Sequence, residues 1–133
     1  MNLKILTIKD PGIKEKERVV LSVLADINLG DYLIAKTYTL KDERISAELE
    51  DVMWLPDQDL KQGDQVVVYT KAGEKNKITN SDGSTSYFYY WELSEPIGDE
   101  EEAGAIIFEA DWDFERAYSK PVKADEFDAT QVK

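Results

Sequence analysis

The sequence predicts an all-β protein with the architecture of an antiparallel β-sandwich of about seven short strands. Runs rich in β-branched and aromatic residues recur along the chain, turn residues separate them, and little of the chain has helical periodicity. The 133 residues are the length of one domain. We expect this domain to comprise residues 1–118, because residues 119–133 are mostly polar and are predicted to form a loosely ordered tail.

The N-terminal part of the chain contains three predicted strands. Residues 3–8 alternate well enough for a strand, which ends where Pro11 prevents further ladder hydrogen bonds. Residues 19–25 are apolar on almost every position, a pattern typical of a central strand. Residues 32–39 form the third strand, and the turn before them contains glycine, which tolerates left-handed backbone. We therefore predict a hairpin at residues 19–39.

The next segment leaves two interpretations open. Within residues 40–51, Ile45 and Leu49 recur at roughly helical spacing, yet they also fit the period of two that is typical of a strand. Extended or irregular structure is favoured over a helix. Residues 52–55 are then predicted to form a short strand that ends at Pro56.

Residues 60–91 are predicted to form a long β-hairpin around which the other strands pack. Its two strands are residues 65–70 and residues 87–91, which are rich in valine and in aromatic residues. The polar loop between them, residues 71–86, includes an Asp-Gly pair that indicates a tight turn. The last predicted strand, residues 103–110, follows an acidic run.

Parts of this pattern resemble a known family. The glycine-led turn and strand at residues 60–69, and the turn and aromatic-aliphatic strand at residues 28–34, resemble segments of lamin-tail-like domains. Trp91, followed by the acidic turn at residues 98–102 and the strand at residues 104–108, is similar to the last part of those domains. The resemblance implies an immunoglobulin-like β-sandwich that binds or tethers and has no catalytic residues.

The composition limits the classes of function. The chain contains no His and no Cys, which removes the commonest general base, the commonest zinc ligands and thiolate chemistry. The net charge of -12 argues against binding nucleic acid through phosphate contacts, which require clustered Lys and Arg. No apolar run approaches the roughly 18 residues of a membrane span, and the N-terminus lacks a signal-peptide pattern, so we expect a cytoplasmic protein.

An aromatic run is the strongest candidate for a contact surface. In a strand, Tyr87, Tyr89 and Trp91 share one face, whereas Phe88 and Tyr90 share the other. A sandwich strand has only one core face, so one of these rows must meet solvent, a loop, the tail or a partner. The sequence leaves open which row is exposed.

The predicted function is a non-enzymatic binding or interaction module that recognises a protein partner, or a glycan, through the hairpin loop and the adjacent aromatics. No catalytic residue, metal site or cofactor is expected. Two alternatives stay open: an acidic inhibitor or DNA mimic that docks on a basic partner, and a carboxylate-dependent Ca²⁺-binding module or hydrolase. The predicted binding residues are Lys75, Lys77, Asn80, Asp82, Tyr87, Tyr89 and Trp91.

Overall fold

The structure, a computed structural model, describes residues 1–118, and the tail predicted at residues 119–133 lies outside the described residues. The described chain is all-β, as predicted, with ten strands and two short 3₁₀ helices. There are more strands than the predicted seven because paired segments of two to four residues also form strands. The strands are β1 (Leu3–Lys9), β2 (Arg18–Val23), β3 (Ile27–Asn28), β4 (Tyr32–Tyr38), β5 (Glu50–Trp54), β6 (Asp59–Leu60), β7 (Gln65–Tyr69), β8 (Asn76–Thr79), β9 (Thr85–Tyr90) and β10 (Ala103–Glu109).

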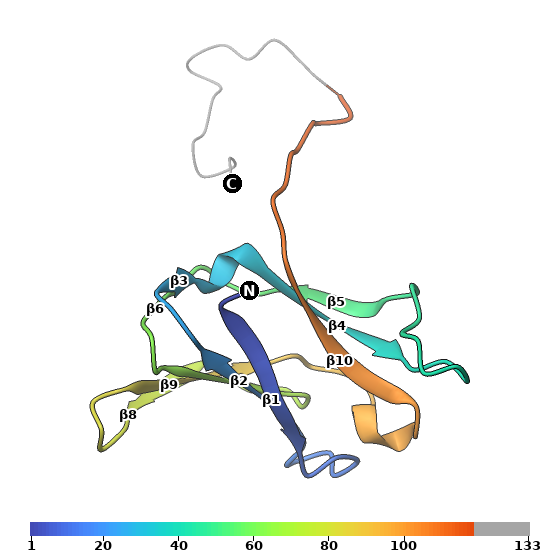
Figure 1. Ribbon diagram of the computed structural model, residues 1–133, viewed down its shortest axis with the longest axis horizontal. Coiled ribbons are helices and arrows are strands. Elements are labelled where there is room, and N and C mark those ends of the chain that lie inside the picture. The colour runs from blue at the N-terminus through green and yellow to red at the C-terminus, as the bar shows by residue number, and fades with distance from the viewer. Residues whose placement is uncertain (119–133) are drawn as a thin grey trace.

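The strands form two main sheets that lie as two layers (Figure 1). The five-stranded sheet has the order β1-β2-β7-β9-β8, and the three-stranded sheet has the order β10-β4-β5. A two-stranded ribbon of β3 and β6 lies at one end of the molecule. The prediction that residues 19–25 form a central strand is confirmed, because β2 pairs with β1 on one side and with β7 on the other.

The core lies between the two layers and is built by strand alternation. In β7, Val66 and Val68 point into the core and are fully buried, whereas Val67 points to the opposite face of the sheet. The three-stranded sheet contributes Tyr32 and Ile34, which are also buried. Each buried side chain of this size stabilises the fold by about 1.5–3 kcal/mol relative to an exposed one.

The prediction of a hairpin between residues 65–70 and 87–91 is wrong, because β7 and β9 are parallel neighbours. After β7 the chain runs back as β8 at the sheet edge and turns at Gly83 into β9, which lies between them. Gly83 has a φ of 88°, which glycine adopts without strain. The predicted tight turn therefore joins β8 to β9. The sequence pattern concealed β8 because all four of its residues are exposed and only Ile78 is apolar.

The predicted hairpin at residues 19–39 is also wrong, since β2 and β4 belong to different sheets. The connection between them contains β3 and the short helix η1 (Leu29–Asp31). Asn28 caps this helix, because its side-chain oxygen accepts a hydrogen bond from the Gly30 nitrogen at 2.7 Å. This connection carries the chain from one layer to the other. Alternation in the sequence does not distinguish a turn within a sheet from a crossing between sheets.

Residues 40–51 contain no helix, so the favoured interpretation is confirmed. Thr39 and Ile45 form an isolated antiparallel bridge, and the chain then enters β5, which pairs with β4. Nowhere in residues 1–118 is there a helix long and apolar enough to cross a membrane.

One carboxylate is completely buried. Glu17 has a relative exposure of 0%, is the last residue of the β1–β2 loop and lies against the short helix η2 (Ile97–Asp99). Its two oxygens accept hydrogen bonds from the backbone nitrogens of Gly12 at 2.8 Å, Ile97 at 2.7 Å and Gly98 at 2.8 Å. A single side chain therefore joins two loops that are about 80 residues apart in the sequence.

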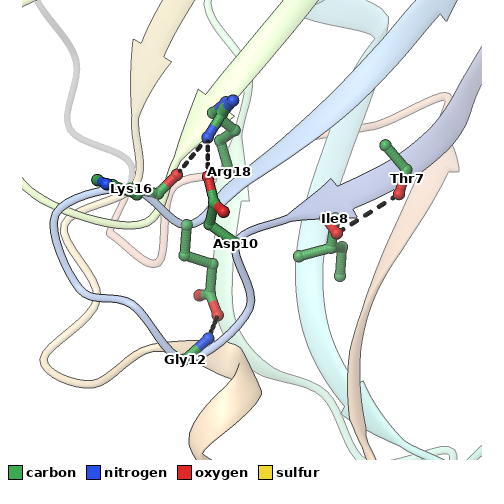
Figure 2. A network of polar contacts seen from close by, with 7 residues as sticks. Thr7, Ile8, Asp10, Gly12, Lys16 and Arg18 are labelled. Carbon is green, nitrogen blue, oxygen red and sulfur yellow. Dashed lines mark hydrogen bonds and ion pairs between the residues drawn. The ribbon is translucent and has the colours of Figure 1, made fainter.

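The β1–β2 loop is also held by the residue after Glu17 (Figure 2). Arg18 Nη1 donates to Asp10 Oδ2 at 2.7 Å and to the Lys16 carbonyl oxygen at 2.8 Å. Gly12, at the far end of this loop, has a φ of 82°. The loop is therefore tied to the start of β2 on one side and, through Glu17, to η2 on the other.

Candidate functional site

A cleft of about 700 Å³ opens where the β3–β6 ribbon faces the starts of β7 and β9. This volume lies within the range of pockets that bind ligands. Its lining comes from β3, β6, the start of β9 and the neighbouring turns, and most of the lining residues are polar. The lining residues are Asp26, Ile27, Asn28, Asp31, Asp59, Leu60, Lys61, Asp64, Gly83, Thr85 and Tyr87.

Asp64 joins two walls of the cleft. The residue is 7% exposed, and it lies directly before β7. Its Oδ2 accepts a hydrogen bond from the Lys61 nitrogen at 2.9 Å, and its Oδ1 accepts one from the Thr85 nitrogen at 2.9 Å. Because both oxygens are engaged by backbone N–H groups, Asp64 holds the turn before β7 against the start of β9.

The rim of the cleft carries side chains from the ribbon and the neighbouring turns. Asp26 Oδ1 accepts a hydrogen bond from the Gln62 nitrogen at 2.9 Å, which brings the turn after β2 to the turn before β7. Across β3 and β6, Asn28 Nδ2 donates to Asp59 Oδ1 at 3.4 Å. These contacts fix the positions of the carboxylates while leaving them exposed to solvent.

Negative charge dominates the cleft. Four of its lining residues are aspartates, and Lys61 is the one cation among them. Asp26, Asp31 and Asp59 are exposed at the rim. A concave surface lined by one sign of charge concentrates its field, so the cleft attracts ammonium and guanidinium groups.

The carboxylates of the described residues 1–118 are not grouped as metal ligands. Within residues 1–118, no three His, Cys, Asp or Glu side chains lie together in a way that could hold a metal ion. In the acidic run at residues 99–102, Glu100 instead accepts a hydrogen bond from Lys36 Nζ at 2.8 Å. This hydrogen bond lowers the pKa of Glu100 and raises the pKa of Lys36.

Two of the predicted residues, Asn80 and Asp82, lie in the β8–β9 turn, whose Gly83 lines the cleft. Asp82 Oδ1 accepts hydrogen bonds from the Ser84 hydroxyl and backbone nitrogen at 2.6 and 2.9 Å, and these bonds lower the pKa of Asp82. Asn80 Nδ2 donates to Ser84 Oγ at 3.0 Å. Asn80 and Asp82 therefore stabilise the β8–β9 turn. Lys75 and Lys77 are exposed but do not line the cleft.

Of the predicted aromatic contacts, Tyr87 alone lines the cleft. Tyr89 and Trp91 are each 7% exposed and belong to the core. The Trp91 indole N–H donates to the Asp51 carbonyl oxygen of β5 at 2.7 Å, which ties the end of β9 to the other layer. The row that points away from the core is Phe88 and Tyr90, and both are partly exposed.

The cleft aspartates were not among the predicted binding residues. Asp26 and Asp64 lie in two separate turns and Asp59 lies in β6, so no short motif contains them. The sequence did carry one partial signal, because aspartate in a turn commonly accepts backbone hydrogen bonds. That signal identifies a turn, but it does not reveal which segments of the chain meet at the cleft.

We expect the buried Tyr89 to make the protein less stable at high pH. Burial raises the pKa of the Tyr89 phenol to about 12, with a smaller contribution from Tyr87. An unfolded tyrosine titrates near pH 10. The folded state therefore holds this proton more tightly, so the stabilisation is complete below about pH 10 and is lost as the pH rises towards about 12.

Urea denaturation at about pH 8 and at about pH 11 measures this effect. Between these two pH values, titration of Tyr89 should lower the free energy of unfolding by about 1 kcal/mol. The fall should be smaller in Tyr89→Phe, which has no phenolic proton. An equal fall in the variant and the wild type would assign the alkaline instability to other groups.

Comparisons of the chain with models of protein families, with curated proteins and with solved structures give no match.

Proposed function

We propose that this protein is a non-enzymatic binding module whose cleft receives a cationic segment of a protein partner. The observation that carries the proposal is the charge of the cleft, which is lined by four aspartates and one lysine. Lys and Arg side chains supply donors that match carboxylates at the rim. The ring of Tyr87 adds an aromatic wall, against which a cation also packs favourably.

The non-enzymatic part of the proposal rests on chemistry. The chain has no His and no Cys, so nucleophilic and general-base mechanisms that depend on them are absent from this protein. Two of the cleft aspartates join backbone segments, since both oxygens of Asp64 and one oxygen of Asp26 accept backbone hydrogen bonds. Side chains engaged in this way position a surface; they do not move protons.

We also propose that the two layers are an immunoglobulin-like sandwich of the lamin-tail kind. The sequence resemblance and the stacking of two β-sheets around one core support this assignment. Domains of this architecture carry function on the loops at the ends of the sandwich, because the strands are committed to the core. The cleft lies at such an end, between the β3–β6 ribbon and the β8–β9 turn.

An acidic inhibitor or DNA mimic is the second candidate, and the net charge of -12 favours it. The two candidates differ in where the contact lies. A mimic spreads its contact over the acidic surface as a whole, whereas the cleft uses a few aspartates at one end of the molecule. The experiment below separates them.

We expect Asp31→Asn combined with Asp59→Asn to weaken binding of a short arginine-rich peptide about tenfold. Both residues are exposed at the rim, and each exposed charge pair contributes about 0.5–1 kcal/mol. Isothermal titration calorimetry at low salt measures the loss. In nuclear magnetic resonance spectra, the peptide should shift the amide signals of Gly83, Thr85 and Tyr87 first.

The matched control is Glu95→Gln combined with Glu101→Gln, which removes the same charge from exposed residues outside the cleft. This control should retain the wild-type affinity. An equal loss of affinity in both double variants would contradict the cleft and favour a contact spread over the acidic surface. A peptide that leaves all cleft resonances unmoved would also overturn the proposal.

A further inference from the structure

The chain leaves β10 as a segment that exposes three large aromatic side chains, and we call residues 111–118 the aromatic arm. Trp112 is 62% exposed, Phe114 is 73% exposed and Tyr118 is 82% exposed. Acidic residues alternate with the first two aromatics. Figure 1 shows the arm running away from both sheets. Exposed aromatic side chains gathered on one short segment are typical of an interaction site.

The base of the arm is fixed to the body of the protein. The Ala110 nitrogen donates to the Asp31 carbonyl oxygen at 3.0 Å. The Trp112 ring meets the Trp54 ring edge-on, with 5.3 Å between ring centres and an angle of 75°. The Trp54 indole N–H in turn donates to the Gly30 carbonyl oxygen at 2.6 Å. The arm is therefore presented in a defined direction, which lowers the entropic cost of docking it.

The strands of the five-stranded sheet carry cations and no carboxylates, although Asp10 and Glu15 of the adjoining β1–β2 loop form ion pairs with Arg18 and Lys71. None of the strands β1, β2, β7, β8 and β9 contains Asp or Glu, although the chain as a whole has a net charge of -12. The same strands contain Lys4, Lys9, Arg18 and Lys77. Because Leu3, Ile5 and Ile8 face the core, alternation and pairing place Lys4, Lys9 and Arg18 on the outer face.

Aromatic side chains lie on this same outer face. The rings of Tyr69 and Tyr90 stack with 5.5 Å between their centres and an angle of 13°. The Arg18 guanidinium lies 5.9 Å from the centre of the Tyr69 ring, and the Lys71 ammonium lies 5.2 Å from it. Phe88 is partly exposed two residues before Tyr90 in the same strand. We call this surface of β1, β2, β7 and β9 the basic face.

We propose that the aromatic arm of one copy of the chain docks on the basic face of a second copy. The acidic residues of the arm meet Lys4 and Lys9, and Trp112 and Phe114 pack against the aromatic row. Opposite charges select the register of such a contact, and buried aromatic anchors supply most of its affinity. When two copies exchange arms reciprocally, the symmetry closes the assembly as a dimer.

We place the arm on a second copy because the basic face of its own chain points away from the arm. The arm leaves β10 in the three-stranded sheet, and Figure 1 shows it running away from the five-stranded sheet. The basic face is the outer surface of that five-stranded sheet. A fixed base at Trp112 keeps the arm from turning back around the molecule.

The test is the mass of the full chain in solution, measured by sedimentation and by light scattering from about 1 µM to about 1 mM, the range in which modest interfaces form. We expect the wild type to be dimeric at the high end of this range. Trp112→Ala combined with Phe114→Ala should weaken association at least about tenfold. High salt should also weaken the association of the wild type.

Charge reversal identifies the two surfaces that meet. Lys4→Glu combined with Lys9→Glu reverses the basic face, and Asp111→Lys combined with Asp113→Lys reverses the arm. Each variant alone should be monomeric, because its arm and face then carry the same sign. Mixing the two variants should restore association, since each arm again meets a face of opposite charge.

Several results would overturn the proposal. If the wild type stays monomeric throughout this concentration range, the proposal is wrong, and the lysines of β1 serve only to protect the edge of the sheet from pairing with another chain. Association that survives the arm variants, or variants that fail to associate when mixed, would place the interface elsewhere. Binding of a fluorescent single-stranded oligonucleotide to the basic face of a monomeric wild type would assign that face to nucleic acid instead.

Discussion

Glu17→Ala is expected to lower the free energy of unfolding by about 4 kcal/mol. This is the largest effect that we predict for the substitution of a single polar residue. The carboxylate is fully buried and accepts three backbone hydrogen bonds at 2.7–2.8 Å. Removing it leaves one buried N–H group, that of Ile97, and two partly buried ones, those of Gly12 and Gly98, without an acceptor. A buried group left in this way costs about 1–3 kcal/mol. Urea denaturation followed by tryptophan fluorescence measures the change.

The loops that Glu17 joins have no room to rearrange. A Cβ atom at Gly98 would lie 2.4 Å from the Gly12 nitrogen, so the two loop backbones are already in direct contact. Since η2 precedes β10 directly, we expect the loss of the carboxylate to loosen the three-stranded sheet as well as the loop.

Two further variants make the Glu17 experiment specific. Glu17→Gln keeps the shape but replaces one acceptor oxygen by an NH₂ group, so its cost should lie between that of alanine and the wild type, at about 2 kcal/mol. Glu15→Ala removes an exposed carboxylate from the same loop and should change stability by less than about 0.5 kcal/mol. Equal stabilities of Glu17→Ala and Glu15→Ala would contradict the structural role assigned to the buried carboxylate.

Tyr89→Ala is expected to lower the free energy of unfolding by about 3–4 kcal/mol, because it empties a large site in the core. Tyr89 is 7% exposed and packs in the cluster between the two layers. The neighbouring Tyr90 offers a matched control, since the same substitution falls on the next residue of the same strand. Tyr90 points outward and stacks on Tyr69, so Tyr90→Ala should cost about 1 kcal/mol.

This pair of variants tests the division of the aromatic run between core and surface. The sequence left open which row was exposed, and the structure places Tyr89 inward and Tyr90 outward. Similar losses of stability in the two variants would contradict that division. The result also bears on binding experiments, because loss of a partner in Tyr89→Ala would reflect unfolding, whereas Tyr87 is the aromatic residue that lines the cleft.

The cleft depends on side chains that have structural as well as electrostatic roles. Asp64 joins the turn before β7 to β9, so replacing it would change the shape of the cleft together with its charge. Asp31 and Asp59 are exposed, and their substitution changes charge with little effect on packing. The binding test therefore uses these two rim residues.

The sequence by itself determined the class of the fold and most of its strands. Residues 3–8, 19–25 and 32–39 were each predicted as strands and overlap β1, β2 and β4. These predictions succeeded because alternation and β-branched residues are local properties, which a strand must have wherever it lies in a sheet. The Asp-Gly turn was recognised for the same reason, since Gly83 needs its positive φ locally.

The tertiary structure alone decided which strands pair, in which direction, and what lies between them. Parallel pairing of β7 with β9, and the passage of the chain from β2 in one sheet to β4 in the other, follow from contacts between distant residues. The burial of Glu17 and the meeting of Asp26, Asp59 and Asp64 at the cleft likewise depend on long-range contacts. Local patterns specify which face of a strand is apolar, but the partner of each face is chosen by the packing of the whole chain.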